Sequence, residues 1–317
     1  MRNGLSFRKA FTAVCIATTM MVAPALADYP EKGVTLIVAY GAGGGTDTTA
    51  RLLAADLAKT IGQPVTVQNV TGGGGWNGWG AIAAADTDGY TIGYINIPNM
   101  YSGYLNPEML RKENLESFKP LMNHVTDYCV WAVKPDSPFK SIADVIAAAK
   151  AGKVSITAHG AGGDDDLAIQ RIEKLNGIEL AVVHNKSTAD SKTQVLGGNV
   201  DVLGANVSEV AAQHAAGELR VLGVMSAERS GFLSDVPTFK EQGFDQVWSV
   251  SRGIAGPAGL PDDIAAKIIA ALESTITSDG HKASAKKLSL APEIVKGETY
   301  LNFLKQTEQE IKGLMGW

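Results

Sequence analysis

The sequence predicts an α/β fold built on parallel β-sheets, and three observations support this fold class. Short apolar runs of strand length recur along the chain, and segments with helical periodicity separate them. The first run, residues 34–40, is continuously apolar, as expected for a strand that is buried on both faces. The chain has 317 residues, which is enough for two domains with separate cores.

The N-terminal segment has the pattern of a cleaved export signal rather than of a folded domain. A basic beginning precedes an apolar stretch over residues 10–23, and the small-residue motif Ala25-Leu26-Ala27 follows it. The stretch is shorter than the ~20 residues that a membrane-spanning helix needs, which argues against an uncleaved anchor. We therefore expect residues 1–27 to be a signal peptide, with cleavage after Ala27.

The composition excludes several classes of function. The formal net charge is −5 at pH 7, and no cluster of Lys and Arg forms the basic patch that nucleic-acid binding requires. Cys129 is the only cysteine after the expected cleavage, so no disulfide within the chain can form. Because the overall charge repels anions, an anionic ligand has to be held by local dipoles.

The region before residue 100 has the strand–helix order of a parallel sheet. Strands are expected at residues 34–40, 65–69 and 91–97, with a helix after each of the first two. Asp47 or Thr46 is expected to cap the first helix, and Gly62 is expected to end it. This β-α-β-α-β order implies parallel strands joined by right-handed crossovers.

The middle of the chain repeats this alternation, and the C-terminal region is mostly helical. Ser141 and Ser208 are expected to be helix N-caps. The expected strands are residues 128–133, 154–158, 180–183, 200–205 and 219–224, and the expected helices are 142–151, 164–176, a segment that ends at 197, and 208–217. After an extended segment at 247–255, helices are expected at 262–277, 281–290 and 299–314, where they would cover the first sheet.

Glycine-rich turns follow three of the predicted strands, at residues 41–45, 72–78 and 160–163. At such a turn the first N–H groups of the next helix are unpaired, and the positive end of the helix dipole lies behind them. Glycine allows a ligand to approach these N–H groups closely. One such turn is often only a tight connection, but three at the carboxyl ends of parallel strands indicate an anion-binding crevice.

The motifs of nucleotide enzymes and hydrolases are absent from the sequence. The first glycine turn lacks the third glycine of the dinucleotide fingerprint, and no acidic ribose-binding residue ends the second strand. No phosphate-binding G-x-x-x-x-G-K-[ST] loop, H-x-x-x-H pair, cysteine cluster or G-x-S-x-G nucleophile elbow occurs. We therefore predict a protein without catalytic residues, cofactor or metal.

Several side chains near the glycine turns have two open interpretations. The run Asp164-Asp165-Asp166 suits a cation or an amino group, or it caps a helix and otherwise faces solvent. His159 and His184, with Lys186 nearby, either contact a carboxylate or are loop histidines. Trp76 and Trp79 either wall the pocket or belong to the core, and we favour Trp76 as a pocket residue. The other histidines, His124, His214 and His281, are interpreted as surface or packing residues.

An ordered set of motifs along the chain resembles the substrate-binding proteins of tripartite tricarboxylate transporters, also called the Bug family. The resemblance covers essentially the whole chain after the expected signal peptide. The motifs are Tyr29-Pro30-Glu31-Lys32, Gly43-Gly44-x-x-Asp47-x-x-Ala50-Arg51, Gly72-Gly73-Gly74-Gly75, Asp88-Gly89-Tyr90-Thr91, Ser137-Pro138-Phe139-Lys140-Ser141, Leu196-Gly197-Gly198-x-Val200-Asp201, Val236-Pro237-Thr238-Phe239 and Gly256-Pro257-Ala258-Gly259-Leu260-Pro261.

The resemblance implies an α/β periplasmic-binding-protein fold of type II, the two-domain Venus flytrap with two hinge crossings. The first domain is expected at residues 28–126 plus 249–317 and the second at residues 127–248, with the ligand cleft between them. The resemblance further implies a monomeric periplasmic receptor. Such a receptor passes a small organic anion to the large and small membrane subunits of a tripartite transporter.

In the family, backbone N–H groups and ordered waters at strand–helix loops hold the ligand carboxylates. Carried onto this chain, and joined with the side chains discussed above, the loops predict one set of ligand-binding residues. These are Ala42, Gly43, Gly44, Gly45, Thr46, Asp47, Gly74, Gly75, Trp76, Asn77, His159, Gly162, Gly163, Asp164, Asp165, His184, Lys186, Ser187, Asp190 and Asn206.

Two departures from the family pattern affect the expected ligand. Many members have proline where Ala42 stands, and many have an aromatic residue and glycine around residues 184–187. Tricarboxylates, dicarboxylates, aromatic carboxylates and an amino-acid ligand therefore all stay open. Two other functions also stay open: a receptor that presents its ligand to a sensor kinase, and an exported hydrolase or isomerase that uses His159 or His184.

Overall fold

The structure is a computed structural model that describes residues 1, 29–109 and 111–317. Apart from Met1, the expected signal peptide and its cleavage site lie outside the described residues. Among the described residues, no helix combines the length and the apolar character needed to cross a membrane.

The first group of strands contains the predicted parallel unit. Strands β1 (Val34–Val38), β2 (Val65–Asn69) and β3 (Thr91–Ile97) are parallel in the order β2-β1-β3, which confirms the expected β-α-β-α-β beginning. Strand β9 (Ser249–Pro257) is antiparallel to β3, and β10 (Pro292–Lys296) is antiparallel to β4 (Phe118–Val133).

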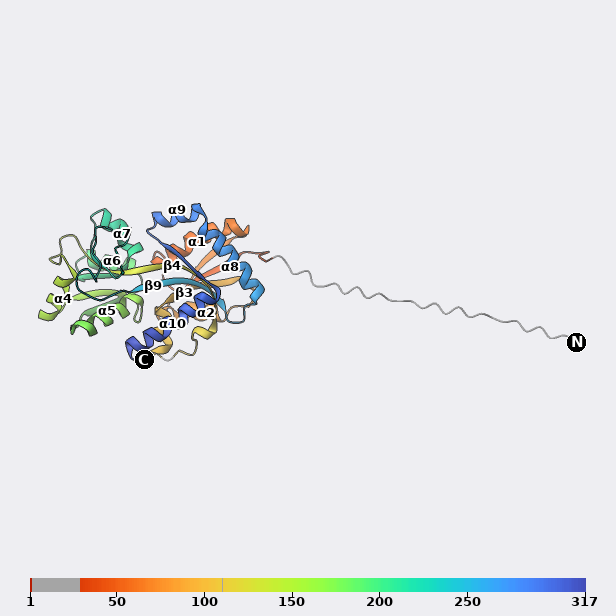
Figure 1. Cartoon of the computed structure of the whole chain (residues 1–317), viewed down its shortest axis with the longest axis horizontal. Helices are drawn as coiled ribbons and strands as arrows, with labels where there is room; N and C mark the ends of the chain where they lie inside the picture. Colours follow the sequence, from red (N-terminus) through yellow and green to blue (C-terminus); the bar gives the residue numbers. More distant parts are fainter. Residues whose placement is uncertain (2–28, 110) are drawn as a thin grey trace.

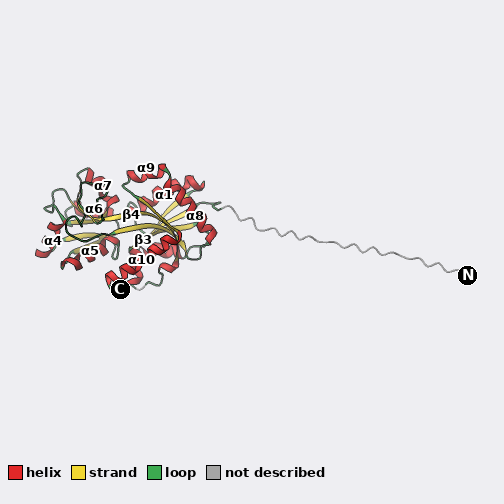
Figure 2. Ribbon diagram, viewed as in Figure 1, coloured by secondary structure: helices red, strands yellow, loops and turns green. Residues whose placement is uncertain are grey.

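Helices cover both faces of this first group of strands (Figure 2). On one face, α1 (Gly45–Ile61) packs apolar side chains on β1 and α8 (Asp262–Thr277) packs them on β4, and α9 (Asp279–Lys287) lies beside both helices. On the other face lie α2 (Trp76–Ala83), α3 (Asn99–Leu105) and α10 (Gly297–Met315). The C-terminal helices therefore return to the first sheet, as predicted.

The second group of strands repeats the parallel arrangement. Strand β5 (Ser155–His159) lies between β6 (Ala181–Asn185) and β7 (Val202–Asn206), and both are parallel to it. Strand β8 (Arg220–Val224) is antiparallel to β4. The helices of this group are α4 (Ile142–Ala151), α5 (Asp164–Asn176), α6 (Thr188–Leu196) and α7 (Val207–Ala215).

Strand β4 joins the two groups, as Figure 1 shows. It pairs with β9 as far as Tyr128, opposite Ser249, and from Cys129 onward it pairs with β7. The returning chain crosses at the same level, where Cys129 N–H donates to the carbonyl of Trp248 at 3.0 Å. We call the elements on the β1 side the first part and those on the β5 side the second part.

Among the strands and α-helices, three stretches were not predicted, because their sequences mix polar and apolar residues. Residues 118–127 of β4 contain Pro120, Asn123 and His124, yet the apolar side chains among them are buried against α8 and α10. Helix α3 follows Pro98 directly, and its first five residues are all buried, including Asn99 and Ser102. Strand β10 is short and partly exposed, so its pattern is weak.

Two predicted caps are confirmed and three are wrong. Ser141 caps α4, and Gly62 ends α1 with φ 68°. The N-cap of α1 is Gly44, two or three residues before the expected Thr46 or Asp47, and the Asp47 carboxylate accepts the N–H of Gly43 instead. Similarly, Gly163 rather than an aspartate precedes α5, and Asn206 rather than Ser208 caps α7.

Candidate functional site

A small cavity lies between the two parts, where the carboxyl ends of β1, β5 and β7 meet. Its volume is about 20 Å³, which is room for about one water molecule. Residues of both parts line it: Tyr40, Gly41, Gly44, Gly45, Thr46, Asn96, His159, Asp164, Lys186, Ser187, Thr188, Asn206, Glu209, Val250 and Arg252.

The first glycine turn contributes the N-terminus of α1 to this cavity. Gly43 has φ 81°, a conformation that favours glycine. Asp47 fixes the turn, because its carboxylate accepts the N–H of Gly43 at 2.9 Å and is paired with Arg51 at 2.9 Å. Burial acts to raise the pKa of Asp47, but the hydrogen bonds from Arg51, Gly43 and Asn69 outweigh it and lower this pKa. Asp47 therefore orders the turn and does not line the cavity.

A carboxylate of the protein itself occupies the N-terminus of α1. Glu209, from α7 of the second part, accepts the N–H of Gly45 at 2.9 Å and the hydroxyl of Thr188 at 2.8 Å through Oε1. Its other oxygen, Oε2, accepts the N–H of Asn206 at 3.0 Å. One carboxylate thus receives hydrogen bonds from α1, α6 and the start of α7. Sequence reasoning did not select Glu209, because a glutamate in the first turn of a helix is a common capping-box residue.

A buried ion pair closes the cavity from the side of the strands. Arg252 in β9 is 2% exposed, and its Nη1 lies 2.8 Å from Oδ2 of Asp127, which is 4% exposed. The same guanidinium donates to Oδ1 of Asn206 at 3.2 Å and contacts Thr49 and Ser208. Arg252 was missed because it sits inside a strand, where no turn or motif marks it.

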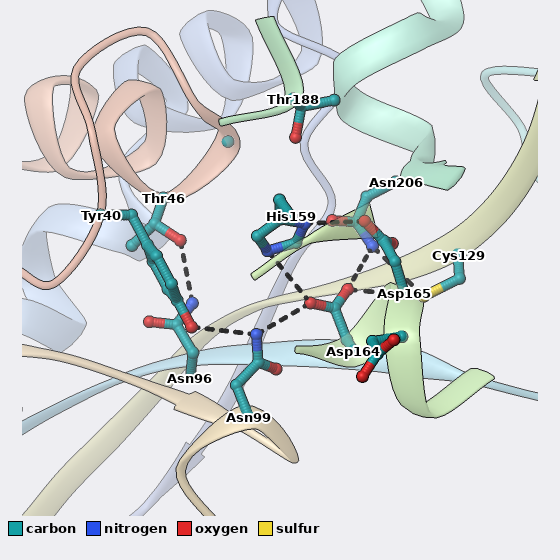
Figure 3. A network of polar contacts seen from close by, with 12 residues as sticks. Tyr40, Thr46, Asn96, Asn99, Cys129, His159, Asp164, Asp165, Thr188 and Asn206 are labelled. Carbon is teal, nitrogen blue, oxygen red and sulfur yellow. Dashed lines mark hydrogen bonds and ion pairs between the residues drawn. The ribbon is translucent and has the colours of Figure 1, made fainter. Parts of the chain in front are cut away.

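A polar network surrounds Asp164 at the start of α5 (Figure 3). The Asp164 carboxylate accepts Nδ2 of Asn99 at 3.0 Å and Nδ2 of Asn206 at 2.9 Å, and it lies 3.4 Å from Nε2 of His159. Asn99 belongs to the first part, and Asp164 belongs to the second. The network therefore bridges the two parts next to the cavity.

His159 carries a positive charge in this network. Its Nδ1 donates to Oδ2 of Asp165 at 2.7 Å. Burial acts to lower the pKa of His159, but the charges of Asp165 and Asp164 outweigh it and raise this pKa to about 10. Burial and the charge of Asp164 raise the pKa of Asp165 to about 6. Together these groups form a buried cation between two carboxyl groups.

The three consecutive aspartates are all buried, so the interpretation that two of them face solvent is wrong. Asp166 lies behind the network and orders the third glycine turn. It accepts the N–H of Gly162 at 2.8 Å and contacts Nε2 of His184 at 2.8 Å. His184 and Asp166 therefore hold this turn in place and do not line the cavity.

The structure places eight of the predicted ligand-binding residues around the cavity: Gly44, Gly45, Thr46, His159, Asp164, Lys186, Ser187 and Asn206. Asp47, Gly162, Gly163 and Asp165 support the loops behind them. The other predicted residues that do not line the cavity are Ala42, Gly43, Gly74, Gly75, Trp76, Asn77, His184 and Asp190. Seven lining residues were not predicted: Tyr40, Gly41, Asn96, Thr188, Glu209, Val250 and Arg252.

The second glycine turn lies beside the third rather than at the cavity. A side chain at Gly74 would contact the carbonyl of Ala161, which belongs to the third turn. Trp76 is 4% exposed and packs edge-on against Trp79 and Tyr104 in the core. The preference for Trp76 as a pocket wall is therefore corrected: in this conformation its ring is a core residue.

One group of potential metal ligands lies near the cavity among the described residues. Atoms of Cys129, Asp164 and Asp165 all lie within 4.8 Å of one another. Burial and the charge of Asp164 raise the pKa of the Cys129 thiol, so it is protonated and lacks the thiolate that binds metals. His159 lies against both carboxylates instead and balances one of their two charges. The group acts as a hydrogen-bonded support for the cleft.

Comparison with known proteins places these features in a protein family. Residues 49–315 match the model of the tripartite tricarboxylate transporter family receptor, TctC. The protein BugT of Bordetella pertussis is 31% identical over 261 residues, which are 80% of each chain.

Solved structures have the same fold. The periplasmic binding protein BugD is 26% identical, with a TM-score of 0.83 over 91% of this chain and 98% of that one. MatC of Rhodopseudomonas palustris, solved with bound malate, is 20% identical, with a TM-score of 0.82 over 90% of this chain and 99% of that one. The fold is thus the α/β fold of periplasmic binding proteins, as predicted.

Proposed function

Because the chain belongs to the tripartite tricarboxylate transporter receptor family, we propose that it is an exported receptor that binds a small organic carboxylate between its two parts. The family consists of solute receptors rather than enzymes. The cavity lies where two sets of helix N-termini face each other, as expected for a site that closes around its ligand.

One observation carries this proposal. The N–H of Gly45 and the hydroxyl of Thr188 come from different parts and converge on a single carboxylate, that of Glu209, at 2.9 and 2.8 Å. Donors arranged in this way suit the carboxylate of a ligand equally well. Charge-assisted hydrogen bonds contribute about 1.5–3 kcal/mol each, so about four of them support micromolar affinity after ordering costs.

The two-domain division also belongs to this proposal. We assign residues 28–126 plus 249–317 to the first domain and residues 127–248 to the second. The exchange of strand partners along β4 between Tyr128 and Cys129 supports this boundary. A ligand that makes contacts only when the domains close would favour the closed state.

The partners follow from the family. We assign the receptor to the periplasm, as a monomer that delivers its ligand to the large and small membrane subunits of a tripartite transporter. The basic and apolar segment before Ala27 supports export. Malate bound to MatC supports a carboxylate as ligand, and di- and tricarboxylates and aromatic carboxylates are all candidates.

A thermal-shift screen of the mature chain against organic acids tests the function. A ligand that binds only the native state raises the midpoint of thermal unfolding, and calorimetry should then find one molecule bound per chain. The matching neutral amides, such as succinamide beside succinate, serve as controls for charge. Failure of every organic acid to raise the midpoint, or chemical turnover of a bound acid, would contradict the proposal.

A further inference from the structure

Glu209 makes more contacts than its place in a helix explains. As the third residue of α7 it completes a capping box, in which Oε2 accepts the N–H of Asn206. The capping box leaves Oε1 free, yet this oxygen crosses to the first part and accepts the N–H of Gly45. Thr188, which is 4% exposed, donates its hydroxyl to the same oxygen. Oε1 of Glu209 therefore has a role beyond capping α7.

The position of this carboxylate is the one that a ligand carboxylate needs. It lies at the N-terminus of α1, where the helix dipole favours a negative charge. A side chain at position 45 would collide with both Glu209 and Arg252, so the glycine lets the carboxylate reach the backbone.

The inner cavity beside Glu209 is too small for a ligand in this conformation, although a second hollow of about 210 Å³ also borders this side chain. The remaining cavity of about 20 Å³ holds about one water molecule, whereas pockets for small organic ligands are usually about 300 Å³ or more. A ligand that enters the inner cavity and binds the N–H of Gly45 and the hydroxyl of Thr188 therefore has to displace the Glu209 side chain. Moving this carboxylate away leaves the N–H of Gly45 and the hydroxyl of Thr188 without their acceptor, so exchanging one carboxylate for another is the replacement that costs least.

We propose that Glu209 is a built-in substitute for the ligand carboxylate, which holds the empty cleft closed until the carboxylate of a ligand replaces it. This inference rests on the proposed function, because it concerns the same cleft. It names Glu209 as a residue that sets affinity and specificity. A ligand must offer a carboxylate that binds Gly45 and Thr188 better than this tethered one does.

Chemical rescue tests the proposal without knowledge of the natural ligand. The variant Glu209→Ala lacks only the carboxymethyl group, which free acetate can replace. Acetate should raise the unfolding midpoint of Glu209→Ala by about 2–4 °C more than it raises that of the unaltered protein. Acetamide, which has the same shape without the charge, should have no such effect.

Asp144→Ala is the matched control. Asp144 is also the third residue of its helix, α4, and its carboxylate accepts the N–H of the cap Ser141 at 3.0 Å, but it lies away from the cavity. This variant should respond to acetate as the unaltered protein does. Glu209→Gln, which keeps the size of the side chain and one capping oxygen, serves if Glu209→Ala does not fold. Malate is then the probe, with binding about tenfold tighter than to the unaltered protein if it competes with Glu209.

Small-angle X-ray scattering supplies a second, independent measurement. Without ligand, Glu209→Ala should have a larger radius of gyration than the unaltered protein and Asp144→Ala, and acetate should reduce it. Equal scattering of all three proteins, or an equal acetate response, would overturn the proposal. Weaker malate binding by Glu209→Gln would also overturn it, since Glu209 would then be a partner of the ligand. An organic acid screen that fails on the unaltered protein refutes the function instead, and it leaves these comparisons unaffected.

Discussion

Replacing Arg252 by methionine tests the role of the buried ion pair beneath the cleft. Arg252 and Asp127 are 2% and 4% exposed, and their closest nitrogen and oxygen lie 2.8 Å apart. Methionine retains much of the apolar volume of the arginine stem, so Arg252→Met removes mainly the charge and its hydrogen bonds. The variant leaves the Asp127 carboxylate buried without a cation.

The expected loss of stability is large because Asp127 has few other donors. Ser208 still donates its N–H to Asp127 at 3.2 Å and its hydroxyl to the other oxygen. Removing one partner of a buried ion pair typically costs about 3–5 kcal/mol, since the remaining charge is uncompensated. We expect Arg252→Met to fall in this range, mostly through the cost of the isolated carboxylate.

Urea unfolding at pH 7, followed by circular dichroism, measures this cost. The double variant Arg252→Met with Asp127→Asn removes both charges and should recover more than half of the lost free energy of unfolding. The slope of the transition against urea should stay unchanged, because the same surface is exposed on unfolding. A loss below about 1 kcal/mol for the single variant, or a double variant less stable than the single one, would refute this explanation.

Three further predictions address the cleft and its support. Gly44→Pro should weaken carboxylate binding without unfolding the protein, because the ring adds bulk to the cavity wall next to the N–H of Gly45, and the φ of −80° at residue 44 tolerates proline. Calorimetry measures the binding, and unchanged affinity would exclude this turn from the site. The ion pairs of His159, whose pKa is raised to about 10, should stabilise the protein fully below about pH 6.5, progressively less as the pH rises, and no longer above about pH 10. His159→Gln should flatten this part of the plot of unfolding free energy, measured with urea, against pH. An unchanged plot would argue against a charged His159. Gly103→Ala should lower the free energy of unfolding by about 1–3 kcal/mol, because the added methyl group would collide with the indole of Trp76. Gly80→Ala is the control, since the space around residue 80 is open. Equal stability of the two variants would contradict the close packing of Gly103 against Trp76.

Most of the fold was predictable because its strands and glycine turns have strong local patterns. The run at residues 34–40 is apolar apart from Thr35, since β1 lies between two strands and under helices on both faces. By contrast, β4 crosses between the two parts, and its side chains at Leu121, Met122 and Val125 are buried. The polar residues between them make hydrogen bonds to segments that are distant in the sequence. Asn123, for example, donates to the carbonyl of Glu293 in β10, a contact that no local pattern reveals.

The backbone loops of the site were predictable, but the side chains between them were not. Glycine turns indicated the N-termini of α1 and α5, since the chemistry of an unpaired N–H is local. Arg252 and Glu209 reach the cleft only because β9 and α7 are brought together by the fold, from positions 43 residues apart that share no motif. Thr188 was missed although its neighbours Ser187 and Lys186 were selected, because its hydroxyl matters only once Glu209 is opposite.

The pairing of charges in the cleft shows how the proposed carboxylate ligand is compatible with a chain of net charge −5. Arg252 balances Asp127, and His159 balances one of the two carboxylates, Asp164 and Asp165, between which it lies. The donors that converge on Glu209, the N–H of Gly45 and the hydroxyl of Thr188, carry no net charge, and Lys186 on the cavity wall is a nearby cation. If a ligand carboxylate replaces that of Glu209, the N–H of Gly45 and the hydroxyl of Thr188 donate to a carboxylate in both the empty and the liganded protein. The free energy of binding is then set by the rest of the ligand, through its contacts with walls such as Tyr40, Asn96 and Val250.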